Sequence, residues 1–508
     1  MKILLVNSPR KFWPYINEED NFVLPQWMPA IGAIARQAGH QVQCLDCMVS
    51  KVGWTSLRQI IKDEKPDLIG INESHTLYIH EAIRLITLIK EISPHTKIVG
   101  GGVHMTNCAP EILRDNPIDF IVKGEGELPF RALLNELEKI RPDFSSVDGL
   151  AWKNDSGEVV INRPGHLVAN MDELPFPAYD LLPVKAYGKS RYLFSPGGMT
   201  IHHSRGCISD CEFCVWWTIM AKRQLNAQGE EILSPTWRTK SVERVIEEIK
   251  IIKKDYDKHC FLFTDDSWNI SPGWNDRFAE TVLKENIRMN WFAFMRADFM
   301  LRDEKKGILE KLVRSGLSHF CMGVEHASQD VLDGFNKSFY SPGDSELVLD
   351  IFKKKYPGVF IQTTFIVGNQ QESRESIRGL LKYVKKLKVD FPSFHILTPF
   401  PGTALYKKFK EQGIEMESDY SKYDLNTPIV STDNLTRDEV AWEVYLLFRK
   451  SVTLAWLFRG LFSRSGYKRR MYIWWLKVTW KLFIGMIKER VFNMRSGIDL
   501  VVPDWYEK

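Results

Sequence analysis

Apolar and polar positions alternate along residues 1–140 in the pattern of a parallel α/β sheet. Short apolar runs with the length of buried strands are separated by stretches of helical periodicity, of which Pro29–Gly39 and Ile79–Ile92 are the clearest. This alternation predicts a doubly wound sheet, and glycine-rich turns follow its later strands, where such sheets bind ligands. The predicted strands are Lys2–Asn7, Gln41–Asp46, Asp67–Asn72, Lys97–Gly100 and Phe120–Lys123.

The pattern stops after residue 140 and resumes near residue 195. Residues 141–194 are irregular, and Asp172–Pro177 indicates a linker, because proline continues neither a helix nor a central strand. Residues 195–405 repeat the strand–helix alternation, which predicts a partial or full (β/α)6 barrel. Its six predicted strands are Met199–His203, Cys260–Phe263, Trp291–Met295, His319–Gly323, Phe360–Ile366 and Ser393–Leu397.

Residues 406–508 are predicted to form a helical extension with a basic and aromatic character. Between about 440 and 492 acidic residues nearly vanish, and Arg464–Gly466 separates two predicted helices. No apolar run is long enough for a transmembrane helix. Three interpretations stay open: contact of 450–492 with a membrane surface or a lipophilic substrate, which we favour, packing on the barrel as a cap of the active site, or RNA binding. The apolar residues of this segment include Trp474, Trp475, Trp480, Phe483 and Ile484.

Composition narrows the class of protein. A chain of 508 residues with 44% hydrophobic residues is expected to hold two or three folded domains. Its net charge of +4 does not by itself favour a nucleic-acid partner. Eight cysteines in so long a chain are not the pattern of a disulfide-stapled secreted protein, and the N-terminal apolar run is too short for a signal peptide. We therefore expect a cytoplasmic protein, with peripheral contact at the inner membrane face as an extension of that prediction.

Three cysteines, Cys207, Cys211 and Cys214, share the spacing C-x3-C-x2-C. Three thiolates on one loop can bind three irons of a 4Fe–4S cluster and leave the fourth iron open to a ligand. The loop follows the first strand of the second series, so it is expected at the mouth of the barrel. Zinc is the alternative, but zinc sites usually pair two C-x2-C units, and no second unit lies nearby. His202 and His203 fall in a predicted buried strand.

The motif resembles the C-x3-C-aromatic-C loop of radical S-adenosylmethionine (SAM) enzymes, and Phe213 supplies the aromatic residue. Over about residues 195–405, the segments Phe263–Asp266, Met295–Asp298, Gly323–Ser328 and Phe365–Gly368 resemble that family in the same order. The resemblance implies reductive cleavage of SAM to a 5′-deoxyadenosyl radical, with flavodoxin or ferredoxin as the reducing partner. It implies that SAM is contacted by Phe213, Asp265, Asp266, Arg296, Glu325, Ser328 and Gly368.

Each acidic residue in that set also has a structural interpretation. Taken alone, Asp265, Asp266 and Glu325 equally suit a solvated loop or a salt bridge, because most acidic residues are exposed. Their place at the ends of consecutive strands favours the functional interpretation. Cys260 and Cys321 lie in apolar strands and are interpreted as small core residues.

Residues 1–140 resemble the cobalamin (B12)-binding domain that precedes many radical SAM cores. The resemblance lies in Leu24–Pro29, Ala38–Val42, Gly100–Thr106 and Lys123–Glu127. The D-x-H-x-x-G motif, which donates a lower histidine ligand in other B12 proteins, is absent, so either cobalamin binds without that histidine, which we favour, or the domain has lost B12. The resemblance implies cobalamin contacts from Ser74, Gly101, Gly102, Val103, His104, Gly124, Glu125 and Gly126. His75 and His80 are weaker candidates, and Cys44-x2-Cys47 is interpreted as incidental.

Together these resemblances favour a cobalamin-dependent radical SAM enzyme that methylates an unactivated carbon of a hydrophobic substrate, such as a tetrapyrrole or a lipid. One alternative is an oxidative cyclase of the type of the anaerobic magnesium-protoporphyrin monomethyl ester cyclase, which shares this layout. Another is a methylthiotransferase-like enzyme that modifies tRNA, although the extra upstream cysteines and C-terminal β-domain usual there are not evident. A non-enzymatic cobalamin or redox sensor would not need the ordered SAM segments.

Overall fold

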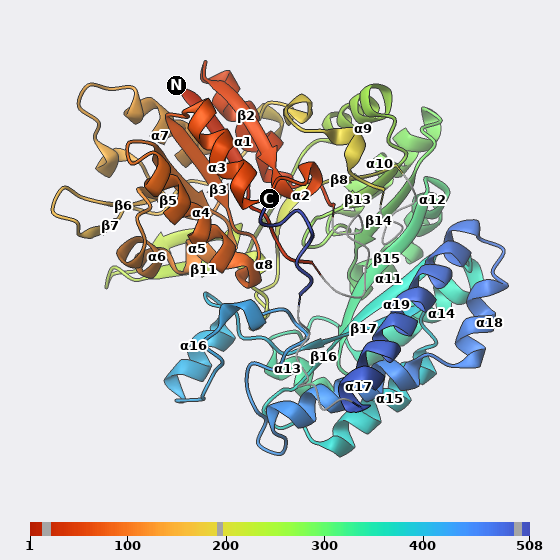
Figure 1. Cartoon of the computed structure of the whole chain (residues 1–508). Coiled ribbons are helices and arrows are strands. Elements are labelled where there is room, and N and C mark those ends of the chain that lie inside the picture. Colours follow the sequence, from red (N-terminus) through yellow and green to blue (C-terminus); the bar gives the residue numbers. More distant parts are fainter. Residues whose placement is uncertain (13–21, 190–196, 492–499) are drawn as a thin grey trace.

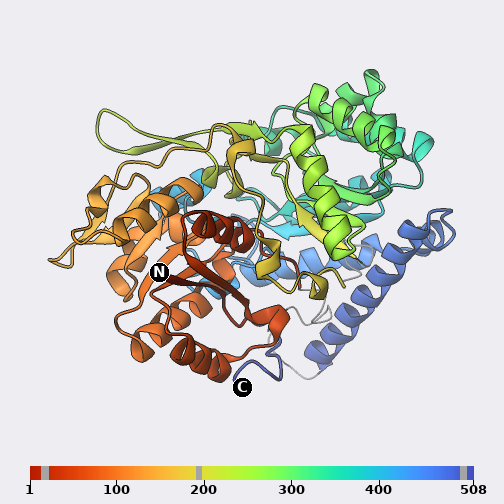
Figure 2. The same cartoon turned by 90° about the horizontal axis from the view of Figure 1, so that it is seen from above.

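The computed structural model describes residues 1–12, 22–189, 197–491 and 500–508, and it confirms the predicted α/β fold class (Figure 1). A seven-stranded sheet forms the N-terminal part, a six-stranded parallel sheet with its helices follows, and helices form the C-terminal extension. The two sheets stand beside each other in both views (Figures 1 and 2).

The N-terminal sheet contains β1 (Lys2–Asn7), β2 (Gln41–Asp46), β3 (Leu68–Asn72), β4 (Lys97–Gly101), β5 (Phe120–Val122), β6 (Leu150–Lys153) and β7 (Val159–Ile161). Their spatial order is β2-β1-β3-β4-β5-β6-β7, and β1 to β5 are parallel. One face is covered by α1 (Trp27–Gln37) and α7 (Glu127–Leu137), the other by α3 (Trp54–Glu64), α4 (Ile79–Ile92) and α6 (Ala109–Asp115). The short helices α2 (Cys47–Ser50) and α5 (Val103–Asn107) follow β2 and β4. The order reverses between β1 and β3, which makes that place the expected ligand crevice.

Strands β6 and β7 lie within residues 141–194, where the sequence indicated only an irregular linker. β6 pairs antiparallel with β5, and β7 pairs antiparallel with β6, so the sheet continues past residue 140. The two strands have four and three residues and lie outside the strand–helix alternation by which the equally short β5 was predicted.

The second sheet is the predicted partial barrel. Its strands are β8 (Gly198–Ile201), β13 (Cys260–Phe263), β14 (Asn290–Phe294), β15 (Leu317–Glu325), β16 (Phe360–Val367) and β17 (Phe391–Ile396). Each is parallel to its neighbours, in the order β17-β16-β15-β14-β13-β8. The helices are α9 (Val242–Tyr256), α10 (Pro272–Lys284), α11 (Ala297–Lys305), α12 (Ile308–Arg314), α13 (Gln329–Gly334), α14 (Pro342–Lys355) and α15 (Arg374–Leu387).

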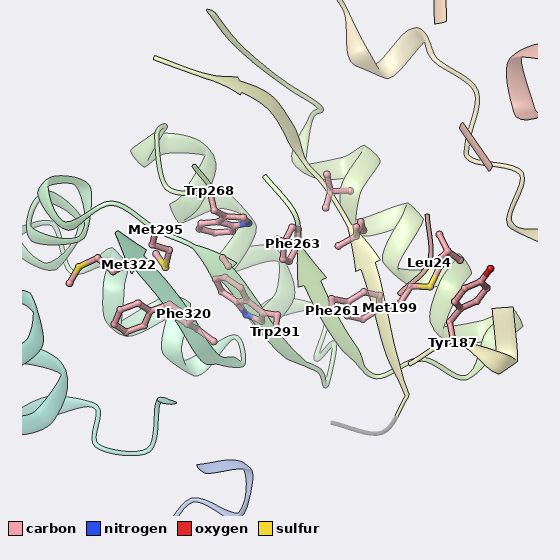
Figure 3. Close-up of a cluster of buried hydrophobic side chains, with 14 of the residues drawn as sticks. Leu24, Tyr187, Met199, Phe261, Phe263, Trp268, Trp291, Met295, Phe320 and Met322 are labelled. Atoms are coloured by element: carbon pink, nitrogen blue, oxygen red, sulfur yellow. The ribbon is translucent and has the colours of Figure 1, made fainter. Parts of the chain in front are cut away.

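Alternate side chains of the barrel strands face the helices and the lumen. The outward face is strongly aromatic and packs against α9 and α10 (Figure 3). Its large side chains are Phe261, Phe263, Trp268, Trp291 and Phe320. On the opposite face, four buried side chains that face the lumen form a small separate cluster: Cys260, Leu262, Phe292 and Cys321. The prediction that Cys260 and Cys321 are core residues is confirmed.

The C-terminal extension contains α16 (Ala404–Glu411), α17 (Arg437–Ser451), α18 (Leu454–Leu461) and α19 (Gly466–Val491), with the predicted break between the last two. Helix α19 packs on the barrel, because Trp475 stacks on Phe391 with 3.3 Å between ring centroids and Tyr472 donates to Asp390 at 2.7 Å. Asp390 directly precedes β17 and Phe391 begins it, so this contact lies at the amino end of that strand. Helices α18 and α19 therefore do not cap the carboxyl ends, whereas Leu405 on α16 donates its backbone N–H to the carbonyl of Glu212 in the cysteine loop at 3.0 Å. The side chain of Phe483 and residue 492 lie outside the described part of the chain.

Candidate active site

The three cysteines of the motif lie on one loop beyond the carboxyl end of β8. The chain turns at His202 and His203 into β9 (Ser204–Cys207), and Cys211 and Cys214 follow before α8 (Trp216–Ile219). β9 pairs antiparallel with β12 (Thr236–Thr239), and between them β10 (Lys222–Leu225) and β11 (Glu231–Ser234) form a hairpin. The sequence predicted none of these short strands, because they lie outside the strand–helix alternation by which the equally short β8 and β13 were predicted.

The environment of the thiols fits an iron–sulfur cluster. Burial raises the pKa of Cys211 to about 11 and that of Cys214 to about 12, so binding of iron must displace their protons. The positive charges of Lys337 and Arg296 oppose this rise at Cys211. Among the described residues, no three His, Cys, Asp or Glu side chains converge as ligands of one metal ion would. A 4Fe–4S cubane takes one thiolate at each of three irons, which matches the three thiols of this loop.

The lumen is open at the carboxyl ends of β13 and β14. Thr264 and Asp266 continue the lumen face of β13, and Phe294 on β14 is 39% exposed there. Burial of the site and the neighbouring Asp265 raise the pKa of Asp266 to about 7. The barrel therefore offers an open and partly polar mouth beside the cysteine loop.

Asp265 and Asp266 both follow Phe263, the last residue of β13, and their side chains have different surroundings. Asp265 is 2% exposed, and its Oδ1 accepts hydrogen bonds from the backbone N–H of His203 at 3.1 Å and of Ser204 at 2.6 Å. These bonds fix the turn that leads from β8 into β9. Asp265 thus has a structural role in holding this turn, while the side chain of Asp266 faces open space.

Arg296 and Glu325 both form hydrogen bonds with neighbouring protein groups. Arg296 Nη1 donates to the hydroxyl of Ser209, in the cysteine loop, at 2.6 Å. Glu325 ends β15 in the left-handed region, with φ of 61°, where a residue other than glycine is strained. Its carboxylate accepts from Lys337 Nζ at 2.6 Å and from Thr364 Oγ1 at 3.0 Å.

The other predicted SAM contacts lie around the same end of the barrel. Ser328 precedes α13, and its backbone N–H donates to His326 Nδ1 at 3.0 Å. Gly368, with φ of 98°, follows β16, and Phe213 packs edge-on against Phe335 at 5.2 Å between ring centroids.

A cavity of about 320 Å³ lies between the two sheets at their carboxyl ends, within the size range of small-molecule sites. The N-terminal domain contributes the ends of β1, β3, β4 and β5, and the barrel contributes the segment from Ser204 to Gly206 together with Thr264 and Asp266. Large apolar side chains complete the wall, and they include Trp27, Phe130, Trp216 and Ile219. Of the predicted SAM residues, Asp266 lines this cavity.

Most of the predicted cobalamin contacts line the same cavity: Ser74, Gly101, Gly102, Val103, Gly124 and Gly126. His104 and Glu125 do not. His104 is 2% exposed, with Nδ1 lying 3.3 Å from Thr76 Oγ1 and its ring against Tyr420. Among the described lining residues His202 is the one histidine, and its ring nitrogens contact Gln26 and Arg205. The glycine-rich rim leaves room for a bulky cofactor over these strand ends.

His75 and His80 occupy other positions. The ring of His75 lies edge-on to Trp216 at 5.7 Å, and His80 Nε2 lies 3.1 Å from Asp419. Burial lowers the pKa of His75 to about 4, so this histidine is neutral at physiological pH.

Gly102 is a position of the rim where the neighbouring backbone leaves no room for a side chain. Its φ of 93° and ψ of 179° are essentially restricted to glycine, and an added Cβ would lie 2.5 Å from the backbone oxygen of Glu73. Gly102→Ala is therefore expected to lower the free energy of unfolding by roughly 2 kcal/mol more than Gly39→Ala. Gly39 also has positive φ, but its Cβ would meet nothing within 4 Å. If denaturant unfolding shows the same loss of unfolding free energy in both variants, this explanation of the rim is contradicted.

Glu125 and Glu127 join the two domains through a cluster of ion pairs that we call the interdomain clasp: Glu125, Glu127, Arg205 and Arg238. Arg205 donates to Glu125 at 2.6 Å and to Glu127 at 2.7 Å, and Arg238 donates to Glu125 at 2.9 Å. Arg205 lies two residues before Cys207. The clasp thus ties the glycine-rich loop after β5 to the strand that leads to the cysteine loop.

Sequence reasoning missed several residues of this site. Arg205, Trp216 and His202 line the cavity, and Lys337 pairs with Glu325. Arg205 and His202 lie a few residues before Cys207, so their place in the sequence could have indicated that they belong to the site. Lys337 had none, because it lies 12 residues after Glu325 in a turn.

Comparisons with known proteins agree with this arrangement. The B12 binding domain family matches residues 15–134, and the Radical SAM superfamily matches residues 201–384. An uncharacterized methyltransferase of Pyrococcus horikoshii is 30% identical over 405 residues, which are 79% of this chain and 82% of that protein. The anaerobic magnesium-protoporphyrin IX monomethyl ester cyclase of Rubrivivax gelatinosus is 27% identical, with 84% of this chain and 73% of that protein covered.

A solved structure shares the fold over almost the whole length. It is the radical S-adenosylmethionine methyltransferase TsrM from Kitasatospora setae, solved with cobalamin and a 4Fe–4S cluster bound. The TM-score is 0.69 at 15% identity, and 96% of this chain and 99% of that chain are covered.

Proposed function

The chain belongs to the radical SAM enzymes that carry a B12-binding domain, and on this premise we propose that it methylates an unactivated carbon of a lipophilic small molecule with the help of cobalamin. The observation that supports the proposal is the shared cavity. Its walls combine the glycine-rich strand ends of the first domain with Ser204–Gly206 and Asp266 of the second. A group held by one domain would thus face a group held by the other.

The two cofactors would supply the reactive chemistry, namely one-electron cleavage of SAM to a 5′-deoxyadenosyl radical at the cluster and methyl transport by cobalamin. The chain's own residues position and shield these groups. Cys207, Cys211 and Cys214 would hold the cluster, and the glycine rim would hold the corrin. Asp266 would bind a polar group of SAM or substrate at the junction of cavity and lumen. We also propose SAM contacts from Phe213, Asp265, Arg296, Glu325, Ser328 and Gly368.

We propose an apolar substrate because large apolar side chains form part of the cavity wall. Trp27, Phe130, Trp216 and Ile219 present apolar surface that would be stabilised by covering with an apolar ligand. A tetrapyrrole agrees with the relative named as a magnesium-protoporphyrin cyclase. That relative also supports a second candidate function, oxidative cyclisation in place of methylation.

The proposed division of the chain is a cobalamin domain at 1–140, a connecting segment at 141–194, a radical SAM core at 195–405 and an extension at 406–508. Strands β6 and β7 attach the connecting segment to the first sheet. A flavodoxin or ferredoxin is the proposed reducing partner.

The test is anaerobic reconstitution with iron, sulfide and cobalamin, followed by turnover with SAM labelled in its methyl group. Extracts of cell lipids and pigments serve as substrate. The proposal predicts label in the cobalamin fraction and then in one extracted compound. Label in cobalamin with an oxidised, unlabelled product would favour cyclisation. A cobalamin fraction without label would contradict methylation, and the absence of any modified compound would contradict both candidate functions.

We further propose that α18 and α19 contact an anionic membrane surface. Leu454, Phe458 and Phe462 on α18 are 74%, 56% and 77% exposed, and Trp480 on α19 is 63% exposed. Residues 451–488 contain no acidic residue, and exposed cations accompany the aromatic ones. These cations include Arg464, Arg469, Arg470, Lys477 and Lys481. No described helix combines the length and apolarity needed to cross a membrane.

Vesicle flotation tests the membrane contact. The protein is expected to float with vesicles that contain phosphatidylglycerol, and the pair of changes Phe458→Ser and Phe462→Ser should reduce the bound fraction at least about tenfold, since each buried aromatic ring contributes more than 1 kcal/mol. Leu347→Ser is the matched control, because Leu347 is 53% exposed on α14, outside this surface. Equal binding of both variants and the unaltered protein would contradict the proposal.

A further inference from the structure

Four consecutive contacts hold the cysteine loop from outside. Arg296 donates to Ser209 at 2.6 Å, and Asn336 Nδ2 donates to Asp210 Oδ1 at 2.7 Å. The backbone N–H of Glu212 donates to the carbonyl of Phe335 at 3.0 Å, and the rings of Phe213 and Phe335 are in contact. The last three contacts come from one short segment, Phe335–Asn336–Lys337, which we call the support turn.

The local backbone explains why the support turn has this shape. It directly follows α13, and Asn336 has φ of 54°, in the left-handed region that asparagine tolerates better than most residues. The N–H groups of Asn336 and Lys337 donate to carbonyls of Asp333 and Leu332, which ends the helix in a tight cap. The turn therefore directs the Asn336 amide at the cysteine loop and the Lys337 ammonium group into the protein.

Lys337 is a buried charge held by a buried partner. Its side chain is 9% exposed, and Nζ donates to Glu325 Oε1 at 2.6 Å and to the carbonyl of Gly323 at 3.0 Å. The residues on both sides of Cys211 contact the support turn, because Asp210 accepts from Asn336 and Glu212 donates to the carbonyl of Phe335. Lys337 is the last residue of that turn, so its buried charge is held beside the cysteine loop.

We propose that Lys337, positioned by the support turn, raises the reduction potential of the cluster bound by Cys207, Cys211 and Cys214. The inference rests on the proposed function, because it presupposes that cluster. Reduction adds one negative charge to the cluster, and a cation in a poorly solvated site stabilises the reduced form more than the oxidised form. Lys337 is thus a positioning and tuning residue that makes the cluster easier to reduce.

The test is an anaerobic redox titration of the reconstituted protein without SAM, followed by EPR of the reduced cluster, with iron content measured in parallel. Lys337→Met keeps the apolar stem but removes the charge, and it should shift the midpoint potential to more negative values. Lys337→Arg should stay near the unaltered protein. Glu325→Gln removes the opposing charge, so its potential should move in the other direction.

Lys468→Met is the matched control. Lys468 is also 9% exposed and lies 2.7 Å from Asp390, but at the amino ends of the barrel strands. It should destabilise the protein like Lys337→Met and leave the potential unchanged. An unshifted potential in Lys337→Met at full iron content would overturn the inference. If Lys337→Met fails to load iron, an unshifted Glu325→Gln overturns it instead. Absence of a cluster from the unaltered protein would refute the proposed function itself.

Discussion

Replacing Cys211 by alanine is expected to abolish formation of 5′-deoxyadenosine and to leave the protein without an intact 4Fe–4S cluster. The motif offers three thiolates, and loss of one leaves two irons of the cubane without a protein ligand. Loss of an outer-shell partner of a metal site already costs about 10- to 100-fold, so loss of a direct ligand should cost more than about 100-fold. The measurement is deoxyadenosine released from SAM under a chemical reductant, with iron and sulfide counted per chain.

Cys47→Ala is the control for this change. Cys47 is a fully buried free cysteine in α2, away from the motif, and its loss removes one thiol without touching the cysteine loop. It should retain the cluster and the deoxyadenosine signal. Deoxyadenosine formation at the normal rate by Cys211→Ala would show that the motif is not the cluster site.

Arg205→Met is expected to lower the free energy of unfolding by about 3 to 5 kcal/mol, because it breaks a buried ion pair from one side. The Arg205 side chain is 11% exposed and those of Glu125 and Glu127 are 2% and 6% exposed. Glu125 keeps Arg238, but Glu127 loses its hydrogen-bonding cation. Denaturant unfolding followed in both domains measures the loss.

The same variant has a predicted pH signature. Burial alone would raise the pKa of Glu127, but the Arg205 guanidinium outweighs burial and holds this pKa below the usual 4.5. A lowered pKa in the folded state stabilises the protein above the unfolded pKa, and this stabilisation disappears as the pH falls through the folded pKa. The difference between the unaltered protein and Arg205→Met should therefore be full at pH 7 and shrink below about pH 4.5.

Arg36→Met is the matched control for the clasp. Arg36 on α1 pairs with Asp180 at 2.8 Å, but the two side chains are 46% and 61% exposed. An exposed pair contributes about 0 to 1 kcal/mol, so this variant should be nearly neutral. An equal effect of both arginine changes would mean that the clasp does not hold the domains together.

The sequence predicted the regular layers because long strands and helices carry a readable period. Lys2–Asn7, Gln41–Asp46 and Ile79–Ile92 have the same bounds in the structure. The antiparallel additions β6, β7 and β9–β12 have four residues or fewer and lie outside the strand–helix alternation by which the equally short β5, β8 and β13 were predicted. The cysteine spacing was readable because the ligands of a cluster loop lie close together in the chain.

The long-range contacts of the site could not be predicted from the sequence. Arg205 and Glu125 are 80 residues apart, and nothing in either sequence segment indicates the other. Asp265 and Asp266 look equivalent in the sequence, but Asp265 accepts hydrogen bonds from the turn into β9 and Asp266 lines the cavity. The chain end shows the same limit: Glu507 pairs with Arg84 on α4, a contact that no local pattern predicts.

Low-temperature EPR of the reduced protein before and after addition of SAM tests the central claim most directly, because only a cluster iron without a protein ligand can bind SAM. The account predicts the signal of a reduced 4Fe–4S cluster, a changed spectrum once SAM is added, and deoxyadenosine in the same sample. A spectrum that SAM leaves unchanged, with no deoxyadenosine formed, would contradict it.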